Sequence, residues 1–343
     1  MSNAGQSDAF AKPRPGTSTS SASSTWAWSS LLGGSRGPAI GLFLLCVVLS
    51  FATPYFLTFR NLLNVLDQVT ILGILAVGGT AVIVIGGIDL SVGAVLALAM
   101  MVLGWLSHDA GLSLGLSAVA AVLVAALCGL ANGLSITLTR LPPFIATLAM
   151  MSIARGVANV ITDGKQIVGY PSWFFNLSSH RYLGFLSVTG AFLVLLYIAA
   201  WAFMRYRVEG RALYALGGSA EVARLSGIRV KLLTVGVYVV AGTLAGVAGV
   251  VLAMRLDSSQ PSAGNGYELD TIAAIVIGGA SLRGGVGQVG GTIVGVLIIG
   301  VLRNGLNLLG VSPFVQQVVI GFVIALAVMF DALRQKSPGR QTH

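Results

Sequence analysis

The sequence predicts an all-α polytopic membrane protein, and its composition and its apolar runs carry that prediction. Charged residues make up 9% of the 343 residues, against about a quarter in ordinary soluble domains. Hydrophobic residues make up 55%, and the mean hydropathy is +0.89. Several apolar runs approach the roughly 20 residues that cross a bilayer as a helix. These runs lack both the polar face of a soluble helix and the alternation of a membrane β-strand.

About ten transmembrane helices are expected along the chain. The apolar runs that predict them cover residues 38–57, 69–87, 92–106, 115–138, 143–162, 183–204, 232–254, 268–282, 289–306 and 313–331. The third, eighth and ninth runs are short, and the last two of these are rich in glycine. Short or broken helices are tolerated in a membrane where neighbouring protein satisfies the freed backbone groups.

Glycine is abundant, with 45 residues in the chain, which predicts a closely packed bundle. Small residues four positions apart let membrane helices approach one another. Two pairs have this spacing inside predicted spans: Gly242 with Gly246, and Gly291 with Gly295.

Residues 81–90 and 273–282 resemble one another. AVIVIGGIDL and AAIVIGGASL match at seven of ten positions, 192 residues apart. Internal repeats are common in transporters, but a coincidence among abundant Ile, Val and Gly also explains the match. Both readings stay open.

Basic residues are distributed unevenly among the loops, and this distribution orients the chain. Lys and Arg collect on the cytoplasmic side of membrane proteins. With the N-terminus inside, 14 of the 20 basic residues fall in cytoplasmic segments: Lys12, Arg14, Arg36, Arg140, Arg205, Arg207, Arg211, Arg224, Arg229, Lys231, Arg283, Arg334, Lys336 and Arg340. Both termini are therefore expected in the cytoplasm. The net charge of +9 follows from this arrangement, so no nucleic-acid partner is predicted.

The same reading divides the chain into three parts. Residues 1–37 are rich in Ser and Thr and are expected to form a disordered cytoplasmic tail. Residues 38–332 form the membrane domain, and residues 333–343 form a short cytoplasmic tail. Within the membrane domain, residues 205–231 hold six basic residues, two acidic residues and four glycines between long apolar runs. This polar stretch offers a cytoplasmic surface to which a soluble partner could bind.

Motifs of two common catalytic sites are missing, and the chain is expected to transport rather than to catalyse. The sequence contains neither the phosphate-binding GxxxxGK(S/T) pattern nor the zinc-binding HExxH pattern. Its three histidines are scattered and its two cysteines lie in apolar runs, so no metal site is predicted. The acidic residues fall in loops or at the ends of predicted spans. This placement does not favour coupling to an ion, so the energy is expected to come from elsewhere.

Arg155 stands out as the basic residue well inside a predicted span. A buried arginine needs a carboxylate or carbonyl partner. Glu268 and Asp270, at the outer end of the eighth span, are the first candidates. Structural pairing and a role in admitting a polar substrate both stay open.

Several long motifs resemble the permease subunits of ribose-type ABC importers. They are GGIDLSVGAVLAL (86–98), LPPFIATLAMMSIARGV (141–157), ALYALGGSAEVARLSGI (212–228), SSQPSAGNGYELDTIAAIVIGGASLRGG (258–285) and NGLNLLGV (304–311). The resemblance covers roughly residues 40–332. It implies a homodimer of mostly ten-helix permeases in the bilayer of the bacterial inner membrane. It also implies two cytoplasmic ATP-binding subunits, which would hold ATP and Mg²⁺ in place of this chain, and a periplasmic sugar-binding protein.

The resemblance further implies that residues 205–231 carry a short coupling helix that contacts the ATPase. We expect this helix near 219–227, with Ser219 as its N-cap and Gly227 ending it. The residues expected at the contact are Gly217, Gly218, Ser219, Glu221, Arg224, Ser226 and Gly227. Relatives usually have Asn at the position of Ser219 and often Ala at that of Val222. The acidic position also varies among them, so the resemblance implies the loop and no specific role for Glu221.

Other polar residues are candidates for gating or for lining the pathway. Asp89 and Ser91, at the inner end of the second span, either cap the next helix or make a gating contact. The amides in or near spans either line a path for sugar hydroxyls or hold helices together. They are Asn132, Asn159, Asn304 and Asn307.

The sequence thus predicts the membrane-spanning permease of an ATP-driven importer for a pentose or hexose. An importer of the same architecture for another polyol, a nucleoside or a sugar-derived signal is the alternative. A self-powered secondary sugar transporter and a membrane-embedded assembly factor are the remaining possibilities.

Overall fold

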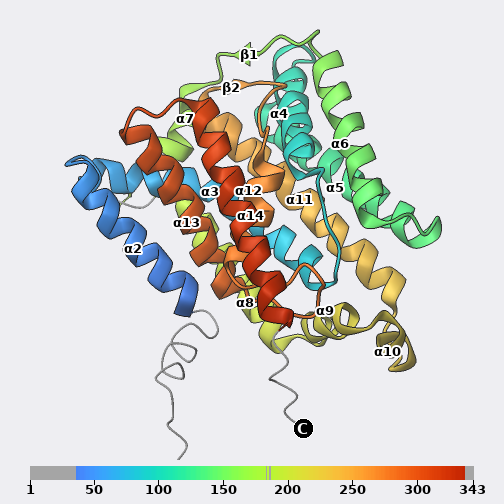
Figure 1. The fold of residues 1–343 in the computed structure, drawn as a ribbon. Coiled ribbons are helices and arrows are strands. Elements are labelled where there is room, and N and C mark those ends of the chain that lie inside the picture. The colour runs from blue at the N-terminus through green and yellow to red at the C-terminus, as the bar shows by residue number, and fades with distance from the viewer. Residues whose placement is uncertain (1–35, 183, 185–186, 337–343) are drawn as a thin grey trace, which may run out of the picture. The chain divides into compact units, whose positions relative to one another are not determined.

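The computed structural model describes residues 36–182, 184 and 187–336, which are mostly helical with almost no sheet (Figure 1). The helices are α2 (Arg36–Ala52), α3 (Phe59–Val84), α4 (Val92–His108), α5 (Leu114–Leu138), α6 (Pro143–Val160), α7 (Ser172–Ser179), α8 (Val188–Tyr206), α9 (Val208–Gly218), α10 (Ala220–Leu225), α11 (Val230–Leu256), α12 (Tyr267–Ile277), α13 (Val289–Leu308) and α14 (Pro313–Lys336). Two short strands, β1 (Ile167–Val168) and β2 (Ser258–Ser259), pair antiparallel. Most of the two predicted tails lies outside the described residues.

Each predicted apolar run coincides with a helix, but the helices differ in their ability to cross a membrane. Among the described residues, α3, α5, α6, α8, α11 and α13 are long and apolar enough to span a bilayer, and three more apolar helices are shorter. That all ten predicted helices cross the membrane therefore stays a prediction. The largest difference in limits is at α3, which begins at Phe59 rather than residue 69 because Thr58 caps it by accepting from the backbone N–H of Asn61.

Helix α3 is the centre of the bundle. Of its most apolar window, 83% is buried inside the protein, against 22% for α6 and for α8. It is packed by α8, α11, α12 and α13. The outward faces of α5, α6 and α8 expose large apolar side chains such as Leu123, Ile153 and Leu195. Those faces suit a surround of lipid, because so much exposed apolar surface is unfavourable in water.

Glycines bring neighbouring helices into backbone contact, as their spacing predicted. A Cβ added at Gly242 would lie 2.5 Å from the carbonyl oxygen of Ala125 in α5. A Cβ at Gly295 would lie 1.8 Å from the carbonyl oxygen of Ala274 in α12. Only glycine fits where two backbones approach this closely.

Helices α3 and α12 end in the same way, and this relates the two similar sequences. Gly86 (φ +79°) and Gly279 (φ +96°) both adopt the left-handed conformation. Each is followed by a backbone N–H that reaches back five residues, from Gly87 to Val82 O and from Ala280 to Ile275 O. The equivalent helix ends are thus 193 residues apart, one more than the spacing of the two similar sequences. Matching residues of the two sequences are therefore displaced by one position relative to the helix ends. The ending of α12 at Ile277 also shortens the predicted eighth span.

Candidate functional site

The polar stretch between α8 and α11 folds into two short helices, of which α10 has the expected limits. Ser219 caps α10, because its Oγ accepts from the backbone N–H of Val222 at 3.3 Å. Gly227 (φ +81°) ends the helix, and its N–H donates to the carbonyl of Arg224 at 3.0 Å. The left-handed conformation costs about 1–2 kcal/mol for a residue with a Cβ, which is why glycine suits this position.

Helix α10 presents an apolar tip to its surroundings. Val222 and Leu225 are 61% and 74% exposed, one helical turn apart, while Ala223 is buried against the rest of the protein. Glu221 and Arg224 form an exposed ion pair at 2.7 Å beside this tip, and the Glu221 carboxylate raises the pKa of Arg224. A short capped helix with exposed apolar residues is suited to docking into a groove of another protein.

Helix α9 connects α10 to the bundle through Gly217. A Cβ at Gly217 would lie 1.8 Å from the carbonyl oxygen of Val84, at the end of α3, and 2.4 Å from the nitrogen of Gly285. Gly218 faces open space. Gly217 is therefore packed against the bundle, whereas a side chain at Gly218 would meet open space; contact of either residue with a soluble partner stays a prediction. Tyr214 adds a second attachment by donating to the carbonyl of Gly287 at 2.8 Å, and burial raises the pKa of its hydroxyl.

Four glycines form what we call the glycine junction: Gly86, Gly217, Gly284 and Gly285. A Cβ at Gly284 would lie 2.7 Å from the nitrogen of Gly86 and 2.9 Å from the carbonyl oxygen of Gly217. The N–H of Gly285 donates to the carbonyl of Val84 at 2.8 Å. The end of α9, the end of α3 and the loop after α12 therefore meet backbone to backbone.

The segment that follows the glycine junction carries the buried Asp89. The Asp89 side chain is 7% exposed, and its Oδ1 accepts from the backbone N–H of Ser91 at 2.8 Å and from the Ser91 hydroxyl at 2.6 Å. Asn132 of α5 donates to the Ser91 oxygen at 3.0 Å. Thr147 of α6 donates to the carbonyl of Ile88 at 3.2 Å. Three of the predicted candidates (Asp89, Ser91 and Asn132) thus form one network, which joins the start of α4 to α5 and α6.

The structure pairs Arg155 with carbonyls. Its Nη1 donates to Pro261 O and Ala263 O, each at 2.7 Å. The predicted partner Asp270 is instead paired with Arg303 of α13 at 2.6 Å, and Glu268 accepts from the N–H of Gly266. Arg303 was missed as a partner because the sequence does not reveal that α12 and α13 lie side by side.

The remaining amide candidates bond to other parts of the protein. Asn304 and Asn61 exchange two hydrogen bonds of 2.9 Å between α13 and α3. Asn307 accepts from Gln316 of α14 at 2.7 Å, and Asn159 donates to the carbonyl of Arg155 in its own helix. Asn61 escaped the sequence analysis because the second span was placed to begin after it.

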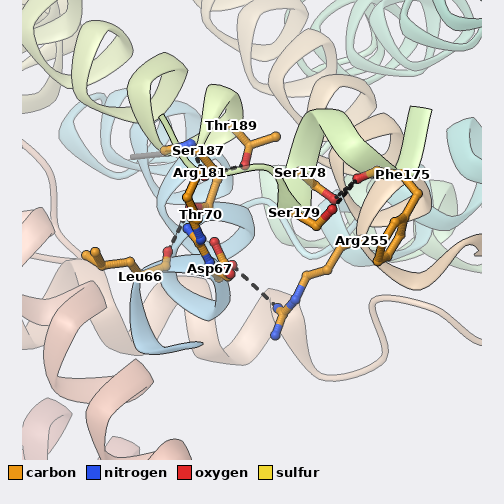
Figure 2. Close-up of polar contacts among 11 residues, drawn as sticks. Leu66, Asp67, Thr70, Phe175, Ser178, Ser179, Arg181, Ser187, Thr189 and Arg255 are labelled. Carbon is orange, nitrogen blue, oxygen red and sulfur yellow. Dashed lines mark hydrogen bonds and ion pairs between the residues drawn. The ribbon is translucent and has the colours of Figure 1, made fainter. Parts of the chain in front are cut away.

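A second polar cluster lies at the start of α3, where the chain enters the bundle (Figure 2). Arg181 forms an ion pair with the Asp67 side chain. Arg255, at the end of α11, points at the same residue and donates to its backbone carbonyl at 3.4 Å. These bonds join α3, α11 and the segment after α7. Among the described residues, no group of three or more His, Cys, Asp or Glu could hold a metal ion.

The helical bundle with lipid-suited outer faces is the architecture of a membrane-embedded protein. Residues 61–328 match the profile of the branched-chain amino acid transport system / permease component family, and the chain belongs to this family. It is a multi-pass protein of the inner (plasma) membrane.

Similar proteins cover nearly the whole chain. The ribose import permease protein RbsC of Bacillus subtilis is 47% identical over 302 residues, which are 88% of this chain and 93% of that protein. RbsC of Escherichia coli is 42% identical, with 86% and 93% covered. The D-allose transport system permease protein AlsC of Escherichia coli is 38% identical, with 84% and 88% covered. No solved structure matches the chain.

Proposed function

We propose that this chain is the permease subunit of an ATP-driven ABC importer for a monosaccharide, and that two copies enclose the path of the sugar. The similarity to permeases named for ribose and for D-allose supports the substrate class, and the higher identity to the ribose proteins favours a pentose. ATP and Mg²⁺ would be bound by a separate cytoplasmic ATPase. A periplasmic binding protein would deliver the sugar to the outer face.

The observation that carries the proposed coupling is the exposed tip of α10. Val222 and Leu225 contribute little to the packing of this chain, and apolar residues in the centre of an interface supply much of its binding energy. The positive-inside rule predicts that α10 and both termini lie in the cytoplasm. The lower part of Figure 1 is consistent with this topology, because α10 and the last turn of α14 lie at the same end of the bundle.

The glycine junction gives the proposed motion a route into the membrane. When the ATPase subunits close on ATP, they would displace α10 and with it α9. Gly217 lies in close backbone contact with the end of α3 and with the loop after α12. A shift of α9 would therefore displace residues 85–91 and the Asp89 network. The path between two copies would then change the side to which it opens.

The proposal is tested by changing the end of α10 without changing the bundle. In a reconstituted complex of permease, ATPase and binding protein, Gly227→Glu should abolish ATP-driven ribose uptake while membrane insertion stays normal. Gly111→Glu is the matched control, because Gly111 is also left-handed (φ +68°) and faces open space but lies in the loop between α4 and α5. Normal uptake by Gly227→Glu would contradict the assignment of α10. Uptake of ribose by the chain alone, driven by an ion gradient, would contradict the importer class.

A further inference from the structure

A groove of about 950 Å³ lies between α8 and α11, with α3 forming its floor. The floor is made by Val77 and Ala81, and the walls include Phe203 of α8 and Val240 of α11. The walls are apolar and open: Phe203 is 42% exposed and Val240 is 52% exposed. At one end the groove reaches Ser226–Arg229, the segment that directly follows α10.

The length of the groove matches one leaflet of a bilayer. It is lined along α11 from Arg229 to Leu244, and a helix rises about 1.5 Å per residue, so the groove runs for about 22 Å. Half of a bilayer, including its headgroup region, is also about 20–22 Å thick. The apolar part of the groove therefore covers the depth of the acyl chains, and Arg229 lies at the depth of the headgroups.

The charges at this end suit an anion. Arg229 is among the residues that line the groove and has no ion pair with any described residue, whereas Glu209, which also lines it, is already paired with Arg207. Arg205 and Lys231 adjoin the lining residues Met204 and Leu232, and they too have no ion pair in the described part of the chain. Basic sites between membrane helices on the cytoplasmic side bind anionic lipid headgroups.

We propose that this groove binds one anionic phospholipid of the cytoplasmic leaflet, with an acyl chain along Val77 and Ala81 and the phosphate at Arg229. The leaflet rests on the topology given under Proposed function. The bound lipid would touch both α9 and the segment after α10, and so would stabilise the position of the docking helix relative to the bundle.

The experiment measures phospholipid retained by the purified chain after extraction from bilayers of neutral phosphatidylcholine with one fifth phosphatidylglycerol. Native mass spectrometry should find one phosphatidylglycerol per chain. Gly236→Trp should remove it, because Gly236 lines the groove and a Cβ there meets only open space. Gly321→Trp is the matched control, since Gly321 also faces open space but lies on α14.

Arg229→Gln tests the contribution of the lipid headgroup separately from that of the acyl chain. Loss of one cation should lower the preference for phosphatidylglycerol over phosphatidylcholine about fivefold while leaving a lipid in the groove. Equal retention by the wild type and Gly236→Trp would overturn the proposal, as would a cross-link between cysteines at position 236 of two copies, which would make the groove a dimer contact. The readout needs no ATPase, so failure of the importer assignment leaves this result unaffected.

Discussion

The two ends of α3 are held by different kinds of contact. Where α3 begins, side chains hold it: Asn61 is paired with Asn304 and Asp67 with Arg181. Where α3 ends, Gly86 and Val84 meet Gly284, Gly285 and Gly217 backbone to backbone. Side-chain pairs hold the first end, whereas the second is held by close backbone packing and by the backbone bond from Gly285 to Val84. If α10 couples to an ATPase as proposed, the end without interlocking side chains would be displaced and the other end would stay in place.

The largest expected effect comes from adding bulk at the glycine junction. Gly217→Val forces the bundle apart at the end of α3, because the atoms in its way are backbone atoms of Val84 and Gly285. Overpacking of this kind costs about 3 kcal/mol, which should lower the thermal midpoint of the detergent-solubilised protein. Gly218→Val is the control, since Gly218 faces open space. Equal destabilisation by the two variants would show that the close contact at Gly217 is not what makes added bulk destabilising here.

Breaking the ion pair between α12 and α13 should have the next largest effect. Asp270→Asn leaves the charge of Arg303 without its partner, and removal of one member of a buried pair costs 3–5 kcal/mol in dry interiors. About 2 kcal/mol is expected here, because the Arg303 side chain is 32% exposed and the Asp270 side chain 5%. Unfolding in denaturant measures the loss, and the double variant Asp270→Asn/Arg303→Gln should recover part of it. A double variant less stable than Asp270→Asn would show that Arg303 has another essential partner.

The amide pair between α3 and α13 should contribute less. Asn304→Ala removes both bonds between Asn304 and the buried Asn61 amide, which keeps its bond to the carbonyl of Phe56; polar contacts between membrane helices contribute about 1 kcal/mol. The same unfolding measurement should find no change for Asn159→Ala, since Asn159 is exposed and its side chain donates to the carbonyl of Arg155 in its own helix. A cost for Asn159→Ala as great as for Asn304→Ala would show that interhelical amide bonding does not stabilise this end.

The smallest effect on folding is expected at α10 itself. Glu221→Gln with Arg224→Gln removes an ion pair whose two side chains are each 66% exposed, so the thermal midpoint should not change measurably. The rate of association with the ATPase, and its dependence on salt, should change instead, because charges at the rim of an interface steer binding. A lower midpoint with unchanged association would mean that the pair stabilises the loop and does not contribute to docking.

Local signals in the sequence were sufficient for the ten apolar helices and for the limits of α10, but α7 and α9 were not predicted. Long apolar runs identified each apolar helix, and Ser219 and Gly227 identified the ends of α10 because capping depends on neighbouring residues alone. Contacts between distant segments could not be predicted in this way. Asp270 was one of two candidate partners for Arg155, whereas the packing of α12 on α13 places it beside Arg303.

The orientation of single residues within a motif was also beyond the sequence. Gly217 and Gly218 are identical neighbours, yet one is pressed against α3 and the other is free. Only the direction in which α9 leaves α8 decides between them. The same holds for Asn61 and Asn304, which are 243 positions apart and become partners only when α13 packs against α3.

The most direct test of the account is a cross-link from the tip of α10. A single cysteine at Leu225, in a chain with Cys46 and Cys128 replaced, should form a cross-link to an ATPase subunit in the complex extracted from the native membrane. The yield should change when ATP is added, because the ATPase subunits move as they close. A cysteine at Val168, which is similarly exposed but lies in β1, should form no such cross-link. Cross-linking from Val168 but not from Leu225 would contradict the central claim that α10 couples this permease to its ATPase.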